Sequence, residues 1–326
     1  MVFLYSSDRN YAPLSIISIY SLLTSNQDAD EIKIYYIDNH IGNDYKEKLN
    51  SLISSYNRKI VYIDASLIDT SFITKTSFSI SGYYRILITN MISEKKIIYL
   101  DCDTIIVGSF KKLWSLDLES YTVAGVKDTV QNYVATSIGM ASNSFYLNSG
   151  FLYLNLEKCR ADNFDFKVRE YFKKFDGLIP HHDQGIINAL ANNSILYLTP
   201  EYNFQSQYFY FHVDELKQLF KIDDFYSKVD IENAAQSIVV IHFLNKFYGR
   251  PWEKNCTHPY LKLFDKIATE AGISIEKGIK NKGTKWRILI RKFLYEHFPF
   301  SFYMAYEHLL DIKREKVFYH TYKRFD

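Results

Sequence analysis

The stretch Ile97-Ile-Tyr-Leu-Asp101-Cys-Asp103-Thr-Ile-Ile-Val-Gly-Ser-Phe110 carries two carboxylates inside a run that is otherwise too apolar for a protein surface. Its first four residues are typical of a strand buried on both faces of a parallel sheet. Asp101 and Asp103 follow at the carboxyl end of this strand, the edge where open α/β sheets bind ligands. A shared divalent cation would relieve their mutual repulsion. A pair of solvated loop aspartates is the alternative, because Asp-x-Asp alone is a common tripeptide.

Length and composition restrict the class of protein. The 326 residues suffice for one large α/β domain or two smaller ones, and a hydrophobic content of 47% fits a globular protein. The net charge of +2 and the lack of a recognised nucleic-acid motif argue against nucleic acid as a partner.

Cysteine usage and the amino terminus bear on the compartment. Three widely spaced cysteines make neither a disulfide framework nor a CxxC zinc pair, which favours a reducing compartment. The amino terminus has no basic region, so no signal peptide is expected, and no stretch approaches the roughly 18 apolar residues of a membrane span. We therefore expect a cytoplasmic protein.

Strands alternate with helices in the first hundred residues. Apolar runs at 2–5, 32–37 and 60–63 predict strands, while Pro13 opens a helix to Leu23 and residues 43–55 form an amphipathic helix. This alternation predicts a mostly parallel sheet with right-handed crossovers.

Polar residues follow the first strand. Asp8 and Asn10 are suited to hydrogen-bond a base or ribose, although both are also ordinary turn formers. The sequence contains no GxGxxG and no Walker lysine loop, so a metal and cationic side chains must hold any phosphates.

The middle of the chain supplies further candidates. Residues 81–92 predict a helix carrying Arg85, which can pair with a phosphate or a carboxylate but is otherwise an ordinary exposed arginine. Strands are expected at 121–126 and 145–154. Asn148-Ser149-Gly150 interrupts the second strand and reads as a bulge that lines a pocket. Asp183 and Gln184 open a helix running to about residue 191, where they can also be simple capping residues.

A buried run from Ile238 ends in His242, and Arg250 follows close enough to meet a phosphate. With Asp101 and Asp103, His242 would make a mixed nitrogen and oxygen site suited to Mn²⁺ or Mg²⁺. Taken alone, a histidine at a strand end is more often structural.

Together these motifs resemble the family 8 retaining glycosyltransferases, in particular the bacterial galactosyl- and glucosyltransferases of surface glycans, over about residues 2–260. The resemblance rests on motifs that occur in the same order: Ser6-Ser7-Asp8-x-Asn10-Tyr11, Tyr84-Arg85, Tyr99-Leu100-Asp101-Cys102-Asp103, Asn148-Ser149-Gly150, Asp183-Gln184, and His242-Phe243 followed by Arg250-Pro251-Trp252. It implies a GT-A fold, which is a mixed, mostly parallel α/β sheet flanked by helices. It also implies a UDP-hexose donor, Mn²⁺, and transfer with retention.

The resemblance also assigns roles by position. Asp101, Asp103 and His242 would bind Mn²⁺ against the diphosphate. The donor would be held by Ser6, Asp8, Asn10, Arg85, Asp101, Cys102, Asn148, Ser149 and Arg250. Asp183 and Gln184 would act in catalysis, either as a nucleophile or beside an acceptor that attacks from the face where UDP leaves.

One segment departs from the family pattern His-Phe-x-Gly-x-x-Lys-Pro-Trp. Asn245 replaces the glycine, Arg250 replaces the lysine, and the segment is two residues longer. Arginine remains a capable phosphate partner.

The last fifty residues change in composition. Residues 277–326 hold 12 Lys plus Arg against 5 Asp plus Glu, a charge of +7, which leaves −5 for the preceding chain. We expect a GT-A domain at 1–275 and a basic aromatic helical region at 276–326. Its helix near 286–295 suits an anionic membrane surface, such as the inner face of the plasma membrane, or packs on the catalytic domain. Related enzymes with such tails act on lipid-linked acceptors, and the resemblance favours the membrane.

The acceptor is expected to be a glycan of lipopolysaccharide, capsule or glycoprotein. Loops near 129–144 and 202–212 would recognise it, and the second loop is rich in aromatic residues that can stack on sugars or fill the core: Tyr202, Phe204, Tyr208, Phe209, Tyr210 and Phe211.

Two other functions remain open from the sequence. The Asp101-Cys-Asp103-Thr segment also resembles the nucleophile loop of haloacid-dehalogenase-like phosphatases, although about a hundred residues precede it and the usual glycine is missing. A catalytically silent UDP-sugar-binding protein is favoured only by the altered segment after His242.

Overall fold

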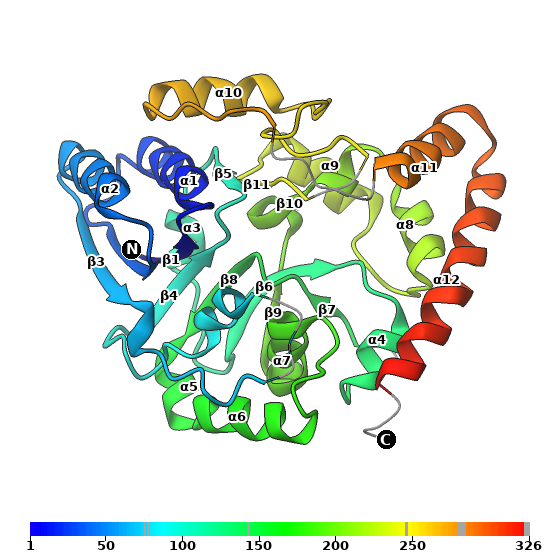
Figure 1. Ribbon diagram of the computed structural model, residues 1–326, viewed down its shortest axis with the longest axis horizontal. Helices are drawn as coiled ribbons and strands as arrows, with labels where there is room; N and C mark the ends of the chain where they lie inside the picture. The colour runs from blue at the N-terminus through cyan, green and yellow to red at the C-terminus, as the bar shows by residue number, and fades with distance from the viewer. Residues whose placement is uncertain (75, 77–78, 142–143, 245–246, 279–284, 323–326) are drawn as a thin grey trace.

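A computed structural model describes residues 1–74, 76, 79–141, 144–244, 247–278 and 285–322. Its main sheet crosses the molecule (Figure 1). Most strands of this sheet pair with their neighbours in one linear path, and a further strand, β9 (Ile195–Leu198), pairs with β6 beside that path. The order along the path is β3 (Lys59–Asp64), β2 (Lys33–Asn39), β1 (Val2–Asp8), β4 (Lys96–Leu100), β8 (Phe151–Asn155), β6 (Val123–Asp128) and β7 (Tyr146–Leu147).

Strand direction explains where the polar residues gather. The pairs β3–β2, β2–β1 and β1–β4 are parallel, and β8 is antiparallel to both β4 and β6. Strands β1, β4 and β6 therefore run the same way, and their carboxyl ends share one edge of the sheet. The expected mixed, mostly parallel α/β sheet is confirmed.

Alternation along β1 divides the core into two layers. Phe3 and Tyr5 pack with α1 (Ala12–Ser25) and α2 (Asn43–Ser55), whereas Leu4 packs on the opposite face. That opposite face is covered by η2 (Ile80–Ile86), α5 (Leu156–Ala161), α6 (Phe164–Lys174) and α7 (His182–Ala191).

A second, smaller sheet lies next to the first and was not expected from the sequence. It joins β10 (Phe204–Gln205), β11 (Val240–His242) and β5 (Thr104–Ile106), with β11 antiparallel to β5. In this register His242 lies opposite Thr104. The sheet therefore brings the end of the 238–242 run beside the turn that carries Asp101 and Asp103.

Shorter helices and 3₁₀ turns connect these strands and precede the C-terminal helices. They are η1 (Ala65–Leu67), α3 (Lys111–Trp114), α4 (Asn132–Ser137), η3 (Asn192–Ser194), η4 (Pro200–Asn203), η5 (Ser206–Phe209), α8 (Val213–Phe220), α9 (Lys228–Gln236) and α10 (Leu261–Glu270).

The predicted helix over 81–92 is wrong. The chain forms only the 3₁₀ helix η2 and then passes into turns. Gly82, the β-branched Ile86, Ile88 and Thr89, and Asn90 all have low helix propensity, so tertiary packing decides the local structure. The predicted strand at 121–126 begins two residues later, and the break at 148–150 is confirmed because β7 and β8 are separate strands.

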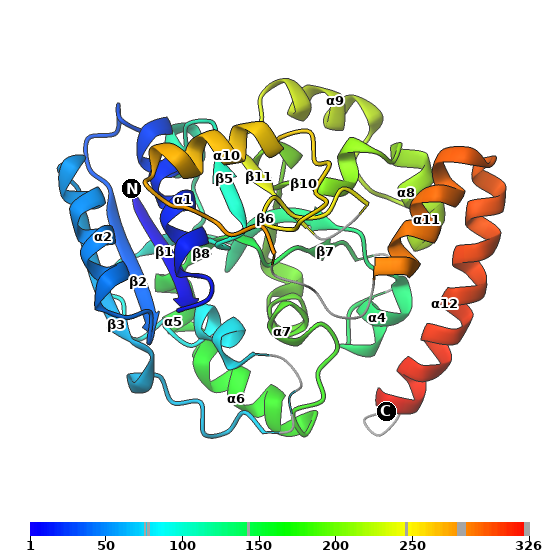
Figure 2. The same cartoon turned by 45° about the horizontal axis from the view of Figure 1, so that its top comes forward.

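The last described residues form two helices, α11 (Lys285–His297) and α12 (Phe300–Tyr322), which confirms the expected helical C-terminal region. Helix α12 runs along one edge of the molecule beside α8 and α4 in both views (Figures 1 and 2). None of the helices within the described residues combines the length and the apolar character that a membrane span requires.

Candidate metal and nucleotide-sugar site

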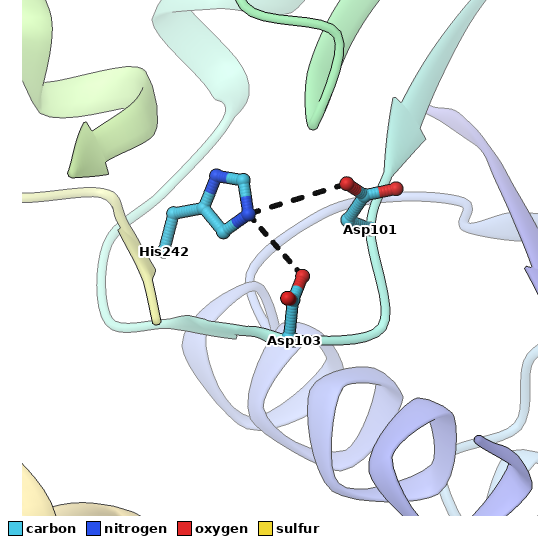
Figure 3. A group of neighbouring side chains, drawn as sticks. All are labelled: Asp101, Asp103 and His242. Atoms are coloured by element: carbon cyan, nitrogen blue, oxygen red, sulfur yellow. Dashed lines mark ion pairs between the residues drawn. The ribbon is translucent and has the colours of Figure 1, made fainter. Parts of the chain in front are cut away.

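Three potential metal ligands converge from the two sheets (Figure 3). His242 Nε2 lies 3.2 Å from Asp103 Oδ1 and 4.0 Å from Asp101 Oδ2. The ligand atoms of all three residues lie within 4.8 Å of one another, and the side chains of His242 and Asp103 are only 3% and 12% exposed. The structure thus brings together the three side chains that the sequence selected as candidate ligands.

The chain turns sharply after β4, which lets both carboxylates face one point. Thr104 Oγ1 donates to the Asp101 carbonyl at 2.7 Å, and the Asp101 N–H donates to the Gly150 carbonyl at 2.9 Å. A Cβ atom on Gly150 would lie 2.2 Å from His242 Cε1. The break at 148–150 therefore lines this site, and only glycine leaves room for the histidine.

Asn203 orients the histidine ring. Its Oδ1 lies 2.9 Å from His242 Nδ1, and its Nδ2 donates to Asn148 Oδ1 at 2.9 Å. A proton on Nδ1 satisfies this contact, which directs Nε2 towards the carboxylates. Burial alone would lower the pKa of His242, but the Asp103 carboxylate outweighs it and holds that pKa above its usual value.

The ligand set fits a divalent cation. Burial would raise the pKa of Asp103, yet His242 and Arg250 hold it below its usual value, so this carboxylate is ionised. Two carboxylates and one imidazole are borderline-to-hard ligands that suit Mn²⁺ or Mg²⁺ better than a thiolate-binding metal.

Arg250 adds a cation on the far side of Asp103. Its Nη2 lies 3.5 Å from Asp103 Oδ2, and its buried Nε has no hydrogen-bond partner in the described ranges. A buried guanidinium nitrogen without an acceptor fits an anionic ligand such as a phosphate. Residues Asn245 and Lys246 lie outside the described residues, but the longer segment still brings Arg250 to the site.

Arg85 is a buried part of the site and not an exposed helix arginine. Its Nη1 donates to Asp101 Oδ1 and to the Ser149 carbonyl, each at 2.9 Å. The guanidinium also lies over the Tyr99 ring, whose hydroxyl donates to Asp101 Oδ1 at 2.5 Å. Arg85 and Tyr99 thereby fix the position of Asp101.

Asp183 lies behind Arg85. Arg85 Nε is 3.4 Å from Asp183 Oδ2 but directs its hydrogen to the Gly82 carbonyl, so the contact is an ion pair without a hydrogen bond. Burial raises the pKa of Asp183 to about 6. The helix that Asp183 and Gln184 were predicted to open is present as α7, which begins at His182, but Asp183 points inward to the site.

Gln184 belongs to a second hydrogen-bonded group. Its Oε1 accepts the Ser149 N–H at 3.0 Å, and its Nε2 donates to Asp128 Oδ2 at 3.0 Å. Asn148 Nδ2 donates to the same oxygen at 3.0 Å. The amide of Gln184 is thus held at both ends, beside the break between β7 and β8.

The residues after β1 lie at the same edge of the sheet. Asp8 Oδ1 accepts the N–H groups of Asn10 and Tyr11 at 2.9 and 3.0 Å, which is the turn-forming role that the sequence left open. Asn10 is exposed. Cys102 is buried and donates its thiol to the Ser6 carbonyl, while Ser6 Oγ has no partner among the described residues.

The aromatic run 202–211 is only partly available to a ligand. Tyr202, Phe204 and Tyr208 are 6%, 1% and 8% exposed and belong to the core, which is the second of the two roles that the sequence left open for them. Short 3₁₀ turns with β10 direct these rings inward. Residues 209–211 are half-buried.

Sequence reasoning missed Asn203 and Asp128. Asp128 ends β6, so the sheet-edge argument that selected Asp101 applied to it as well. No sequence pattern pointed to Asn203, because its role depends on a contact with His242, which lies 39 residues further along the chain.

Comparisons with known proteins agree with this geometry. The family model described as glycosyl transferase family 8 matches residues 2–256. General stress protein A of Bacillus subtilis is 28% identical over 78% of this chain and 88% of its own length. Lipopolysaccharide 1,3-galactosyltransferase of Salmonella typhimurium is 24% identical over 80% of this chain and 75% of its own length.

Among solved structures, galactosyltransferase LgtC in complex with donor and acceptor sugar analogues is similar, with a TM-score of 0.69 and 20% identity over 88% of this chain and 99% of that chain. This likeness shows the shared fold. The expected glycosyltransferase class and the expected GT-A architecture are both confirmed, since the family model spans the two sheets and every ligand of the candidate metal site. The chain therefore belongs to glycosyl transferase family 8.

Proposed function

We propose that this protein is a Mn²⁺-dependent retaining hexosyltransferase that moves galactose or glucose from a UDP-sugar to a glycan acceptor. The observation that carries the proposal is the convergence of Asp101, Asp103 and His242 beside Arg250, whose Nε lacks a partner in the described part of the chain. Departure of UDP leaves negative charge on the β-phosphate, and a cation positioned there in advance stabilises that charge.

The proposed metal would be held by Asp101, Asp103 and His242, and it would act as a Lewis acid towards the diphosphate. Mg²⁺ is a possible substitute because the same ligand types bind it. Arg250 would receive a phosphate oxygen, and its planar fork offers more donors than the lysine of the family pattern.

The remaining donor contacts follow the edge of the sheet. Asp8 and Asn10 would hold the uridine, and the unpartnered Ser6 Oγ supports a polar contact nearby. Cys102 would contribute through its backbone, because its thiol is engaged with Ser6. Arg85, Asn148 and Ser149 would surround the sugar.

We favour acceptor attack on the face where UDP leaves over a covalent intermediate. Asp183 is paired with Arg85, and both ends of the Gln184 amide are occupied. An amide oxygen is also a weak nucleophile. Asp183 would hold Arg85 in place, and the second lone pair of Gln184 Oε1 would face the developing positive charge of the sugar.

The donor is tested by incubating the protein with a panel of UDP-hexoses, with Mn²⁺ and a lipid-linked or oligosaccharide acceptor, and following the product by proton NMR. Release of UDP from one hexose and an anomeric proton of unchanged configuration are expected. Inversion of the anomeric centre, or turnover of none of the sugars, would contradict the proposal.

The two alternative functions lack a supporting observation. Asp101 follows the fourth strand of a family 8 domain, and the metal site takes a histidine from a second sheet, which gives no support to a phosphatase. The hypothesis of a catalytically silent protein rested on the longer segment after His242, and Arg250 still lies beside Asp103 in spite of that length.

We propose that residues 1–275 form the catalytic domain and residues 276–326 an association region. Helix α10 supports this boundary, because it packs on α1, where Tyr20 Oη donates to Glu270 Oε2 at 3.4 Å.

We further propose that the association region binds the cytoplasmic face of a membrane carrying a lipid-linked acceptor. Helix α11 has two faces. Ile288, Arg291 and Tyr295 face the protein, whereas Trp286, Leu289 and Phe293 are 58%, 64% and 53% exposed. An exposed apolar stripe at helical spacing, in a segment of charge +7, suits an anionic bilayer surface.

A further inference from the structure

A cavity of about 410 Å³ lies between α8 and the two C-terminal helices. None of the residues proposed to hold the donor or the metal lines it. Its volume falls in the range of pockets that enclose small ligands, roughly 300–1,000 Å³. The cavity is therefore a separate feature of the protein and large enough for a sugar unit.

An incompletely satisfied pair of acids lines the cavity. Glu307 and Asp311 lie one turn apart on α12 and are 8% and 5% exposed. Arg291 donates two hydrogen bonds to Glu307, and Lys221 Nζ donates to Asp311 Oδ2 at 3.1 Å. Asp311 Oδ1 has no partner in the described residues. A buried acceptor without a donor is unfavourable, and a ligand hydroxyl would satisfy it.

Aromatic rings also line the cavity, and one of them, Tyr303, lies one turn before Glu307 on α12. The Phe211 and Tyr303 rings lie stacked with centroids 6.0 Å apart, and Tyr210 stacks on Phe247 at 4.9 Å. Rings of this kind offer flat apolar faces to the C–H face of a sugar, while the acids supply acceptors for its hydroxyls.

The charges of the lining favour a neutral ligand. Arg291 and Arg314 both contact Glu307, and Lys221 contacts Asp311, so the cations are already paired. Each of these three cations is already engaged by an acid, so an anionic ligand would have to compete with Glu307 and Asp311 for them. The two acids, their paired cations and the aromatic rings together suit a polyhydroxylated, uncharged molecule.

The cavity is connected to the transfer site by a short piece of chain. Gln131 lines the cavity and lies three residues after Asp128, which holds Gln184. Three residues span at most about 11 Å. Asn132 Nδ2 also donates to the Lys221 carbonyl at 3.1 Å, which ties this segment to α8. The cavity therefore lies within the length of a short oligosaccharide from the residues that hold Gln184.

We propose that this cavity is an accessory subsite that binds a neutral hexose unit of the acceptor, at a distance from the sugar that receives the transferred residue. The assignment to the acceptor rests on the proposed glycosyltransferase function, whereas saccharide binding by the cavity can be measured without it.

Saturation-transfer NMR on the full chain tests the subsite with lactose, cellobiose, and the methyl glycosides of galactose and glucose as probes. Met304→Trp fills the cavity from a half-buried position, and Asp311→Asn removes the free carboxylate oxygen. Both variants are expected to bind the best probe roughly tenfold more weakly than the wild type. Asp265→Asn, which breaks a more exposed aspartate–lysine pair elsewhere, is the control and should bind like the wild type.

Equal binding by the wild type and the folded Met304→Trp variant would overturn the subsite. So would the absence of binding to any of the four probes, or a stronger response to glucose 6-phosphate than to the neutral sugars. Thermal unfolding identifies a variant that has failed to fold. UDP-hexose turnover by the wild type is scored separately. If turnover fails while cavity-dependent sugar binding persists, the proposed function falls and the saccharide site stands.

Discussion

Asn203 holds His242 by a contact of 2.9 Å between Asn203 Oδ1 and His242 Nδ1, and Asn203 is itself fully buried. This contact selects the tautomer in which Nε2 can bind a metal. The Asn203→Leu variant leaves the three ligands in place but frees the ring, so Mn²⁺ affinity is expected to fall by roughly 10- to 100-fold. Titration of Mn²⁺ by electron paramagnetic resonance measures this change.

The control for that variant is Asn26→Ala, which also removes a buried amide and breaks the hydrogen bonds to Phe110 and Leu22, far from the site in the fold. It should lower stability without changing Mn²⁺ affinity. Equal Mn²⁺ affinity in Asn203→Leu and the wild type would contradict an orienting role for Asn203.

Gly150 sets the width of the metal site. A Cβ at this position would lie 2.2 Å from His242 Cε1 and 3.0 Å from Asp101 Oδ2, so Gly150→Ala must displace a ligand. A displacement of about 1 Å is expected to lower the rate of UDP-sugar turnover by roughly 100-fold. Gly278→Ala, where an added Cβ meets no atom within 4 Å, is the control and should keep full activity. Similar rates in both variants would show that the close approach is unimportant.

His258 makes stability depend on pH. Burial lowers its pKa to about 4 from the ordinary 6.5. Between these values the unfolded chain binds more protons than the folded one, so stability rises with pH through this window and is lost as the pH falls. The full shift corresponds to about 3 kcal/mol.

The His258→Phe variant keeps an aromatic ring beside Phe209 and Phe243 and removes the titration. Urea unfolding across the same pH window is expected to show a shallower pH dependence for the variant than for the wild type. Parallel profiles would assign the pH dependence to other groups.

The exposed stripe of α11 predicts binding to anionic membranes. The double variant Trp286→Ser with Phe293→Ser is expected to bind vesicles of phosphatidylglycerol and phosphatidylcholine in equal parts at least about tenfold more weakly than the wild type. Co-sedimentation measures this binding. Phe166→Ser, on α6 and 64% exposed, is the matched control. An equal loss in the control would contradict a membrane-binding face on α11. Equal binding to pure phosphatidylcholine would contradict a preference for anionic lipid.

Much of the site was predictable because its residues follow strands. Asp8, Asp101 and Asp103 come directly after buried runs, and parallel strands bring their carboxyl ends to one edge. The glycine at 150 was signalled by a polar break inside an apolar run. Local patterns of this kind are visible along the chain without knowledge of distant contacts.

What the sequence did not predict depends on long-range pairing. Strand β10 has only two residues, and its partner β11 lies more than thirty positions away, so no local pattern marks the second sheet. The burial of Tyr202 and Phe204 follows from that sheet. Helix propensity likewise could not show that Arg85 turns inward from a 3₁₀ segment to meet Asp101.

The central claim, that Asp101, Asp103 and His242 hold Mn²⁺ against the diphosphate of a UDP-sugar, is tested most directly by calorimetric titration of UDP into the protein with and without Mn²⁺. The wild type is expected to bind UDP strongly only when Mn²⁺ is present, and Asp103→Asn is expected to lose this metal-dependent gain while its melting temperature stays close to that of the wild type. UDP binding that is the same with and without Mn²⁺, or unchanged in Asp103→Asn, would contradict the claim.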